Sequence, residues 1–171
     1  MSPSLSEIVL PAVNRDDLAA KMRAFYADAD AAIAAYRPIC RNRGECCRFA
    51  TFGHKLYVSS VELVYFVRHA RSAWREPGES SDCPCQIDGL CAARPYRPLG
   101  CRVFFCDPEA REWQGPEYER RLLELRQIGA DFGVDYRYVE WLSAMRELTD
   151  AIRSKNRGFD GIDAPSPDMI K

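Results

Sequence analysis

Eight cysteines stand in two short blocks of this 171-residue chain, and the rest of the chain has none. The first block holds three of them and the second holds five: Cys40, Cys46 and Cys47, then Cys83, Cys85, Cys91, Cys101 and Cys106. Structural cysteines in a helical protein behave as small apolar residues and would be scattered over the apolar faces. The segregation therefore indicates a role for sulfur itself.

Metal binding is the chemistry that best uses such a set. Zinc and iron–sulfur clusters prefer thiolate ligands, and a closed tetrahedral site takes four of them at about 2.3 Å. Loops can bend to supply these ligands, and each doubling of loop length adds only about 0.6 kcal/mol to the cost of closure. All eight cysteines are thus candidate ligands of zinc or an iron–sulfur cluster. The spacing does not separate these two cofactors.

The number of metal sites stays open at this point. Eight sulfurs can form two four-coordinate sites, or one site with spare thiols. Cys46 and Cys47 are adjacent, and adjacent side chains in an extended segment point apart. They would serve two metals, or one of them would be a free thiol.

Arginines accompany the cysteines closely, and they are Arg41, Arg43, Arg48, Arg94, Arg97 and Arg102. Four thiolates around Zn²⁺ leave a net charge of about −2, and nearby guanidinium groups favour ionised sulfur. Arg97 and Arg102 are the candidates for such a supporting role at the cofactor. The alternative is that these arginines are solvated loop residues.

At these residues the chain resembles the zinc- or iron-chelating cysteine-cluster family, the YkgJ-like proteins with a CxxCxxCC pattern. Cys40, Cys46 and Cys47 match three of the four opening cysteines, and Arg43 stands at the fourth position. The closing signature matches at Cys91, Arg97, Pro98, Cys101 and Arg102. The resemblance covers residues 40–106 and implies metal chelation. Some members of the family have been called iron–sulfur oxidoreductases, but the resemblance does not carry an activity to this chain.

Apart from the cysteines, the sequence gives only weak signals of a catalytic site. Of the two histidines, His69 is interpreted as a packing or surface residue within a helix, and His54 more readily as a loop residue than as a ligand or base. The chain has no Gly-rich phosphate loop, and its carboxylate clusters are typical of solvated surface. Whether the protein is an enzyme is left undecided, and no catalytic residue is assigned.

The elements that must position the cysteines are mainly helical. Apolar residues recur at steps of three and four in four segments, namely 14–37, 59–74, 115–132 and 135–152. Ser59 and Glu62 have the spacing of a capping box, and Gly133 is a typical helix stop. Residues 56–58 predict a short strand. We therefore expect a mainly α fold, a bundle of about four helices with an irregular cysteine-rich metal-binding cap and little β-structure.

Length and charge constrain the remaining choices. We expect an N-terminal extension (1–13), a single domain (14–155) that contains the cysteine-rich region 40–106, and a flexible tail (156–171). The net charge of −1 provides no general attraction to nucleic acid or anionic lipid. No stretch reaches the roughly 20 apolar residues of a membrane span, and the first 14 residues lack the pattern of a secretory signal.

These constraints predict a cytoplasmic protein with reduced thiols, whose expected partner is a metal ion rather than a membrane or nucleic acid. A protein partner stays unidentified. Three functions remain in competition. They are a non-catalytic metal-binding protein, an iron–sulfur oxidoreductase or cluster carrier, and a disulfide-stabilised protein without metal.

Overall fold

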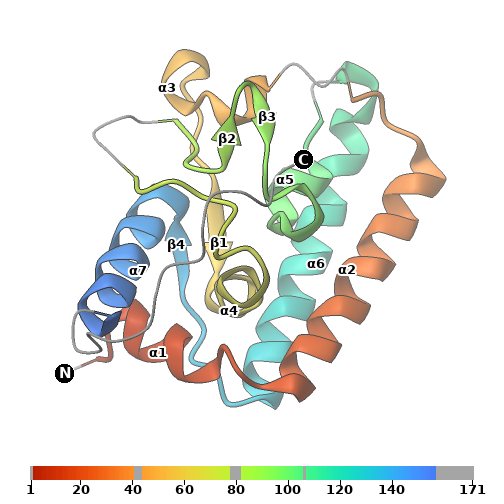
Figure 1. Cartoon of the computed structure of the whole chain (residues 1–171). Coiled ribbons are helices and arrows are strands. Elements are labelled where there is room, and N and C mark those ends of the chain that lie inside the picture. The colour runs from red at the N-terminus through yellow and green to blue at the C-terminus, as the bar shows by residue number, and fades with distance from the viewer. Residues whose placement is uncertain (1, 41–43, 78–81, 106, 157–171) are drawn as a thin grey trace, which may run out of the picture.

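The computed structural model describes residues 2–40, 44–77, 82–105 and 107–156. Helices make up most of this part of the chain (Figure 1), which confirms the predicted mainly α class. The α-helices are α1 (Leu5–Ala12), α2 (Asp16–Tyr36), α3 (Phe49–Phe52), α4 (Ser60–His69), α5 (Leu99–Val103), α6 (Arg111–Asp131) and α7 (Trp141–Asn156). None of the helices in the described ranges is both long and apolar enough to cross a membrane.

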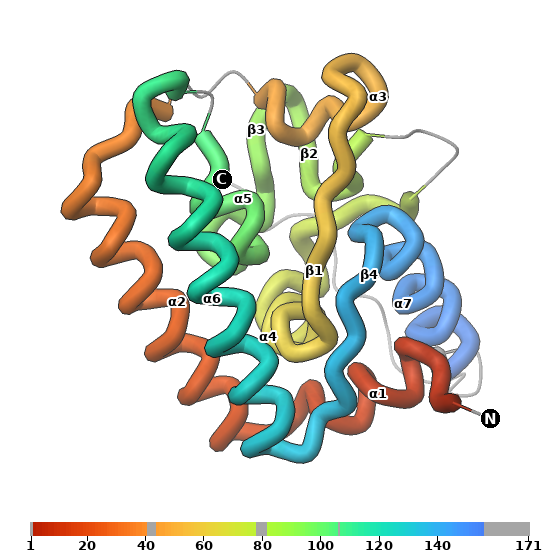
Figure 2. The backbone as a smooth tube through the Cα atoms, turned by 180° about the vertical axis from the view of Figure 1, so that it is seen from behind, coloured from red at the N-terminus to blue at the C-terminus, as the bar shows by residue number. Residues whose placement is uncertain are grey.

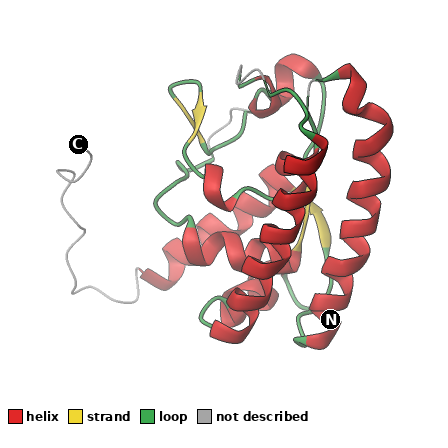
Figure 3. Cartoon of the chain, turned by 90° about the vertical axis from the view of Figure 1, so that its right-hand side faces the viewer, coloured by secondary structure: helices red, strands yellow, loops and turns green. Residues whose placement is uncertain are grey.

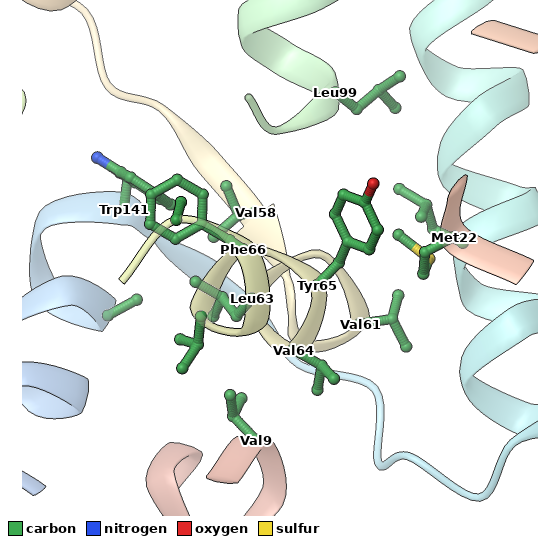
Figure 4. Packing of buried hydrophobic residues seen from close by; sticks show 14 of the residues in the cluster. Val9, Met22, Val58, Val61, Leu63, Val64, Tyr65, Phe66, Leu99 and Trp141 are labelled. Carbon is green, nitrogen blue, oxygen red and sulfur yellow. The ribbon is translucent and has the colours of Figure 1, made fainter. Parts of the chain in front are cut away.

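Helix α4 forms the centre of the molecule. All residues from Ser60 to Val67 are buried, as expected of a helix that is enclosed on every side. Figure 4 shows its side chains between Val9 of α1, Met22 of α2 and Trp141 of α7. Helix α4, which lies between the two cysteine blocks in the sequence, is thus surrounded by α1, α2 and α7.

The predicted capping box starts α4. The carboxylate of Glu62 accepts hydrogen bonds from the backbone N–H and the hydroxyl of Ser59, both at 2.8 Å. It also accepts the N–H of Leu99 at 2.7 Å, where α5 begins, and contacts the Tyr26 hydroxyl of α2 at 3.4 Å. One buried side chain therefore ties three helices together. Burial raises the pKa of Glu62 despite these hydrogen bonds.

Among the described residues, two short antiparallel strand pairs complete the fold, and strands are yellow in Figure 3. Strand β1 (Tyr57–Ser59) pairs with β4 (Tyr138–Glu140) along one face of α4, as Figure 2 shows from behind. The prediction of a strand near residues 56–58 agrees with β1. The second pair is the hairpin of β2 (Gln86–Ile87) and β3 (Leu90–Cys91).

The prediction of a helix from Asp135 was wrong at its start. Residues 138–140 pair with β1, and α7 begins at Trp141. The Glu140 carboxylate accepts the N–H of Leu142 at 3.1 Å and the N–H of Ser143 at 2.8 Å. Glu140 therefore caps α7 through its side chain. The pairing of residues 138–140 with the distant strand β1 therefore outweighs the helical spacing of the apolar residues in this segment.

The predicted N-terminal extension contains a helix. Ser4 and Glu7 form a capping box at the start of α1, and Leu5, Ile8 and Val9 are buried. Helix α1 contacts both α4 and α7, so it belongs to the core.

Helix α6 begins at Arg111, four residues earlier than predicted, because the short 3-10 helix η3 (Pro108–Ala110) leads into it. It runs beside α2 in Figures 1 and 2. Arg121 bonds to Asp28 at 2.5 Å, and Tyr36 stacks on Trp113 at 4.7 Å. The two long helices thus form one wall of the molecule.

Candidate metal centre

The two cysteine blocks meet in one pocket. Its lining includes residues of the β2–β3 hairpin, which Figure 1 draws at the top of the molecule. This cavity of about 210 Å³ lies between the 3-10 helix η1 (Glu45–Cys47), the hairpin and α5. Its lining includes Cys40, Cys46, Cys47, Cys83, Cys85, Cys91 and Cys101, all of them free thiols. Cys106, Arg41 and Arg43 lie outside the described residues, as does the predicted tail from residue 157. Sulfurs from both sides of α4 therefore share one cavity.

Backbone contacts hold the blocks together. The N–H of Cys83 donates to the carbonyl oxygen of Cys47 at 2.8 Å, and the Gln86 side chain donates to the Gly44 carbonyl at 3.2 Å. Gly44 has φ +68°, and a Cβ atom there would lie 2.7 Å from the Gly89 carbonyl oxygen. Only glycine allows the hairpin to approach η1 this closely.

The hairpin sets the place of Cys91 relative to Cys85, since the neighbouring Ala92 N–H donates to the Cys85 carbonyl oxygen at 2.9 Å. Asp88 and Gly89 at its tip both have positive φ, which is the geometry of a tight two-residue turn. Cys91 follows Leu90 in β3 and lies opposite Gln86 in the register. The lack of periodicity had predicted an irregular segment here, although the Asp-Gly pair is a recognised hairpin signal.

Helix α5 brings Cys101 to the same cavity. Its first residue, Leu99, is fully buried and is held by Glu62 through the 2.7 Å hydrogen bond described above. The position of Cys101 therefore depends on a carboxylate of the central helix rather than on the cysteine loops.

Four thiols form a chain of close contacts. The Cys46 thiol contacts that of Cys47, the Cys47 thiol contacts that of Cys83, and the Cys83 thiol contacts that of Cys85. The middle contact joins the first block to the second. Cysteines that are distant in sequence thus become neighbours only in the folded chain.

Two further thiols of the pocket, Cys91 and Cys101, interact with these four thiols. Cys91 interacts electrostatically with Cys46, and Cys101 interacts with Cys83, Cys47 and Cys46. Burial is the main cause that raises the pKa of both flanking thiols. Six sulfurs are therefore close enough to influence one another.

Ionisation of the Cys46, Cys47 and Cys83 thiols is suppressed, because the pKa of each is raised. Contact with Cys46 lowers the pKa of Cys47, but contact with Cys83 and burial outweigh it and raise the pKa to about 12. For Cys83, contact with Cys47 lowers the pKa, while contact with Cys85 and burial raise it to about 12. A cation is the kind of group that would reverse this trend, because metal binding deprotonates its thiol ligands.

Arg97 and Arg102 have different places. Arg97 lines the pocket, and its positive charge opposes the rise in the pKa of Cys46, Cys91 and Cys101. Its Nε atom is buried and has no hydrogen-bond partner among the described residues. Such an unpaired donor suits an anionic acceptor in this cavity, as a thiolate would be.

Arg102 points toward the helices instead. Its guanidinium bonds to the Asp30 carboxylate at 2.7 Å and to the carbonyl oxygens of Arg97 and Pro95 at 2.8 and 2.6 Å. The group also lies over the Tyr26 ring, 4.3 Å from its centroid, in the geometry of a cation–π contact. Arg102 therefore stabilises the position of the segment that carries Arg97. Arg102 itself is not among the described residues that line the pocket.

Two aromatic residues of the pocket lining, Phe66 and Trp141, were not predicted as part of the site. Phe66 of α4 and Trp141 of α7 line the cavity, and their rings meet edge to face at 4.9 Å. Trp141 is 1% exposed, and its Nε1 atom has no hydrogen-bond partner in the described part of the chain. The apolar spacing placed Trp141 on an inward helix face, and such a pattern does not distinguish a core residue from a pocket wall.

The histidines lie outside the described lining. The His54 ring nitrogen lies 3.2 Å from the Cys46 carbonyl oxygen, and its ring packs against Phe49. His69 stacks on Tyr96 at 5.3 Å, and burial lowers its pKa. These contacts agree with the interpretation of His69 as a packing residue and of His54 as a loop residue.

The donor set fits a thiophilic metal in its chemistry, but the sulfurs are arranged as pairs. Within the described ranges, no three His, Cys, Asp or Glu side chains are grouped so as to hold a metal ion. Comparison with protein-family models, with curated proteins and with solved structures found no match for this chain. Inference about function therefore depends on the pocket.

Proposed function

We propose that this protein binds zinc or an iron–sulfur cluster through cysteine thiolates from both blocks. The observation that carries the proposal is the shared pocket, in which seven cysteines from either side of α4 line one cavity. Soft thiolate sulfur is the preferred ligand of both cofactors. The resemblance of residues 40–106 to the cysteine-cluster family points the same way.

Folding energetics support this proposal. Between residues 82 and 98 the regular structure consists of two two-residue strands and one 3-10 turn, η2 (Arg94–Tyr96). Such a segment forms few regular backbone hydrogen bonds of its own. Structural zinc contributes about 10–16 kcal/mol in apparent terms, which is comparable to the stability of a whole domain. A metal would fix this segment against η1 and α5.

Elemental analysis of protein purified without oxygen tests the proposal. A zinc protein is expected to be colourless, whereas an iron–sulfur protein is brown and contains iron with acid-labile sulfide. A strong chelator is expected to disorder the cysteine segment, as seen by loss of amide protection in residues 82–98. Protein that binds neither metal, even after anaerobic reconstitution, would contradict the proposal.

The same experiment separates the other candidates. An iron–sulfur spectrum that changes reversibly on reduction would support the oxidoreductase or cluster-carrier alternative. Titration of thiols in denaturant tests the disulfide alternative, because a protein with four disulfides has no reactive thiol. Metal binding through reduced thiols also agrees with a cytoplasmic location, where thiols are kept reduced.

A further inference from the structure

The pocket that collects the cysteines also contains two residues whose hydrogen-bond donors lack a partner. The Nε atom of Arg97 and the Nε1 atom of Trp141 are buried, and neither has a hydrogen-bond partner in the described part of the chain. Both residues line the cavity, and Trp141 is only 1% exposed. A buried N–H group without a partner costs free energy. Two such groups at one cavity therefore indicate acceptors that a bound molecule supplies.

Aromatic side chains line the same cavity. They are Phe66, Phe104, Phe105 and Trp141. The Gln114 side chain of α6 fixes the segment between α5 and η3, because it accepts the Phe105 N–H at 3.2 Å and donates to the Phe105 carbonyl oxygen at 3.3 Å. Phe66 and Trp141 belong to α4 and α7. Helices thus hold the aromatic residues in place, as in ligand pockets that are formed before binding.

The cavity has room for one aromatic ring with a substituent. Its volume is about 210 Å³, whereas an apolar cavity of roughly 150 Å³ is enough to hold benzene. Two residues of the lining, Leu90 and Phe104, are 56% and 48% exposed. The cavity therefore reaches the protein surface, which gives a small ligand a route into it.

The charge of the lining favours an anion. Apart from the thiols, its described ionisable residues are Arg94 and Arg97, which are positive, and Glu45, which is negative. A carboxylate suits this balance, and guanidinium N–H groups bind carboxylates in a planar geometry. A phosphate group would bring about two negative charges, more than this lining balances. The two unpartnered N–H groups also equal in number the two oxygens of one carboxylate.

We propose that this cavity binds one small aromatic carboxylate. Arg97 pairs with the carboxylate, the indole N–H of Trp141 donates to one of its oxygens, and the ring lies against the aromatic side chains. Binding is non-covalent. The inference goes beyond the proposed metal-binding function and does not depend on it, because none of the groups that it uses is a cysteine.

Calorimetric titration with benzoate tests the inference on the full-length protein, purified under reducing conditions. Benzoate should bind with one molecule per chain. Benzyl alcohol lacks the charge and acetate lacks the ring, so each should bind roughly tenfold or more weakly than benzoate. Elemental analysis of the same sample records its metal content, so that the two proposals are judged separately.

NMR signals of the indole N–H groups show whether benzoate reaches Trp141. The chain has three tryptophans, Trp74, Trp113 and Trp141. Trp113 stacks on Tyr36 and lies outside the described lining of the pocket. Benzoate should shift the Trp141 signal and leave the Trp113 signal in place. The variants Trp74→Phe and Trp113→Phe identify the Trp141 signal by elimination, so Trp141 itself stays unaltered.

Two variants test the donors directly. Arg97→Gln should weaken benzoate binding roughly tenfold or more, because it removes the charge. Trp141→Phe keeps an aromatic ring but removes the N–H, so it should weaken binding roughly three- to tenfold. Arg71→Gln, at an exposed position outside the described lining, is the control and should bind benzoate with wild-type affinity. If a variant fails to fold, the ranking of benzoate, benzyl alcohol and acetate on the wild-type protein still decides.

Two results would overturn the inference. One is binding of benzoate no tighter than that of benzyl alcohol or acetate, and the other is an unshifted Trp141 signal when benzoate is saturating. Protein that contains metal but does not bind benzoate would contradict this inference and leave the proposed function standing. Protein that binds benzoate but takes up neither zinc nor iron would contradict the proposed function alone.

Discussion

The backbone N–H of Cys83 donates a hydrogen bond to the carbonyl oxygen of Cys47 at 2.8 Å, and the thiols of the same two residues are in contact. These residues come from opposite sides of α4 in the sequence. Their pairing is the point at which two loops with little regular structure become one candidate metal centre. Several parts of the fold hold this contact in place, and each can be altered separately.

Gly44→Ala should destabilise the protein more than Gly53→Ala. The two glycines have φ of +68° and +65°. This left-handed conformation costs an L-residue roughly 1–2 kcal/mol. An alanine Cβ at position 44 would also lie 2.7 Å from the Gly89 carbonyl oxygen, whereas at position 53 no atom of the described residues lies within 4 Å. Urea unfolding should therefore show about twice the loss for Gly44→Ala. Equal losses would mean that the hairpin does not pack on η1 as described.

Glu62→Gln should change how stability depends on pH. Burial raises the pKa of Glu62, so the folded protein holds this proton more tightly than the unfolded chain. The stabilisation is complete below the unfolded pKa of about 4.3 and is lost as pH rises through the folded pKa. The free energy of unfolding of wild type, relative to Glu62→Gln, should fall as pH rises above about 4.

The exposed Glu76 supplies the control for this prediction. Its hydrogen bond with Arg153 lowers its pKa, so its contribution is present above the unfolded pKa and is lost as pH falls. Glu76→Gln should thus give a small pH dependence of opposite sign. The same sign for both variants would contradict a buried, proton-binding Glu62.

Arg102→Met should cost about 2–3 kcal/mol of stability, because it leaves two carbonyl oxygens and the Asp30 carboxylate without their donor. The Arg102 side chain is only 6% exposed. Arg120→Met is the matched control, since Arg120 is 51% exposed and pairs with Glu117 and Glu124 on the same helix. Such surface pairs contribute at most about 1 kcal/mol. Comparable losses in urea unfolding would count against a buried role for Arg102.

Arg97→Gln should weaken metal binding roughly 10- to 100-fold while the metal-free protein keeps its stability. The reason is that the Arg97 charge favours ionised sulfur at Cys46, Cys91 and Cys101. Competition with a chromophoric chelator measures the affinity. Arg71→Gln, at an exposed position outside the described lining of the pocket, should leave the affinity unchanged. An unchanged affinity for Arg97→Gln would remove Arg97 from the centre.

The sequence by itself determined the parts of this protein that depend on near neighbours. The spacing of apolar residues predicted α2 and α6, and the Ser59–Glu62 capping box located the start of α4. These signals are reliable because a helix forms its hydrogen bonds within a few residues along the chain. The segregation of cysteines into two blocks was likewise visible without coordinates.

Only the tertiary structure decided which distant groups meet. It paired residues 57–59 with 138–140, buried α1 against α4 and α7, and placed Trp141 on the pocket wall. It also turned Arg102 toward Asp30 and brought the Cys47 thiol to that of Cys83. The physical reason is that such contacts join segments far apart in the chain, so they depend on how all the helices pack around α4 rather than on any local pattern.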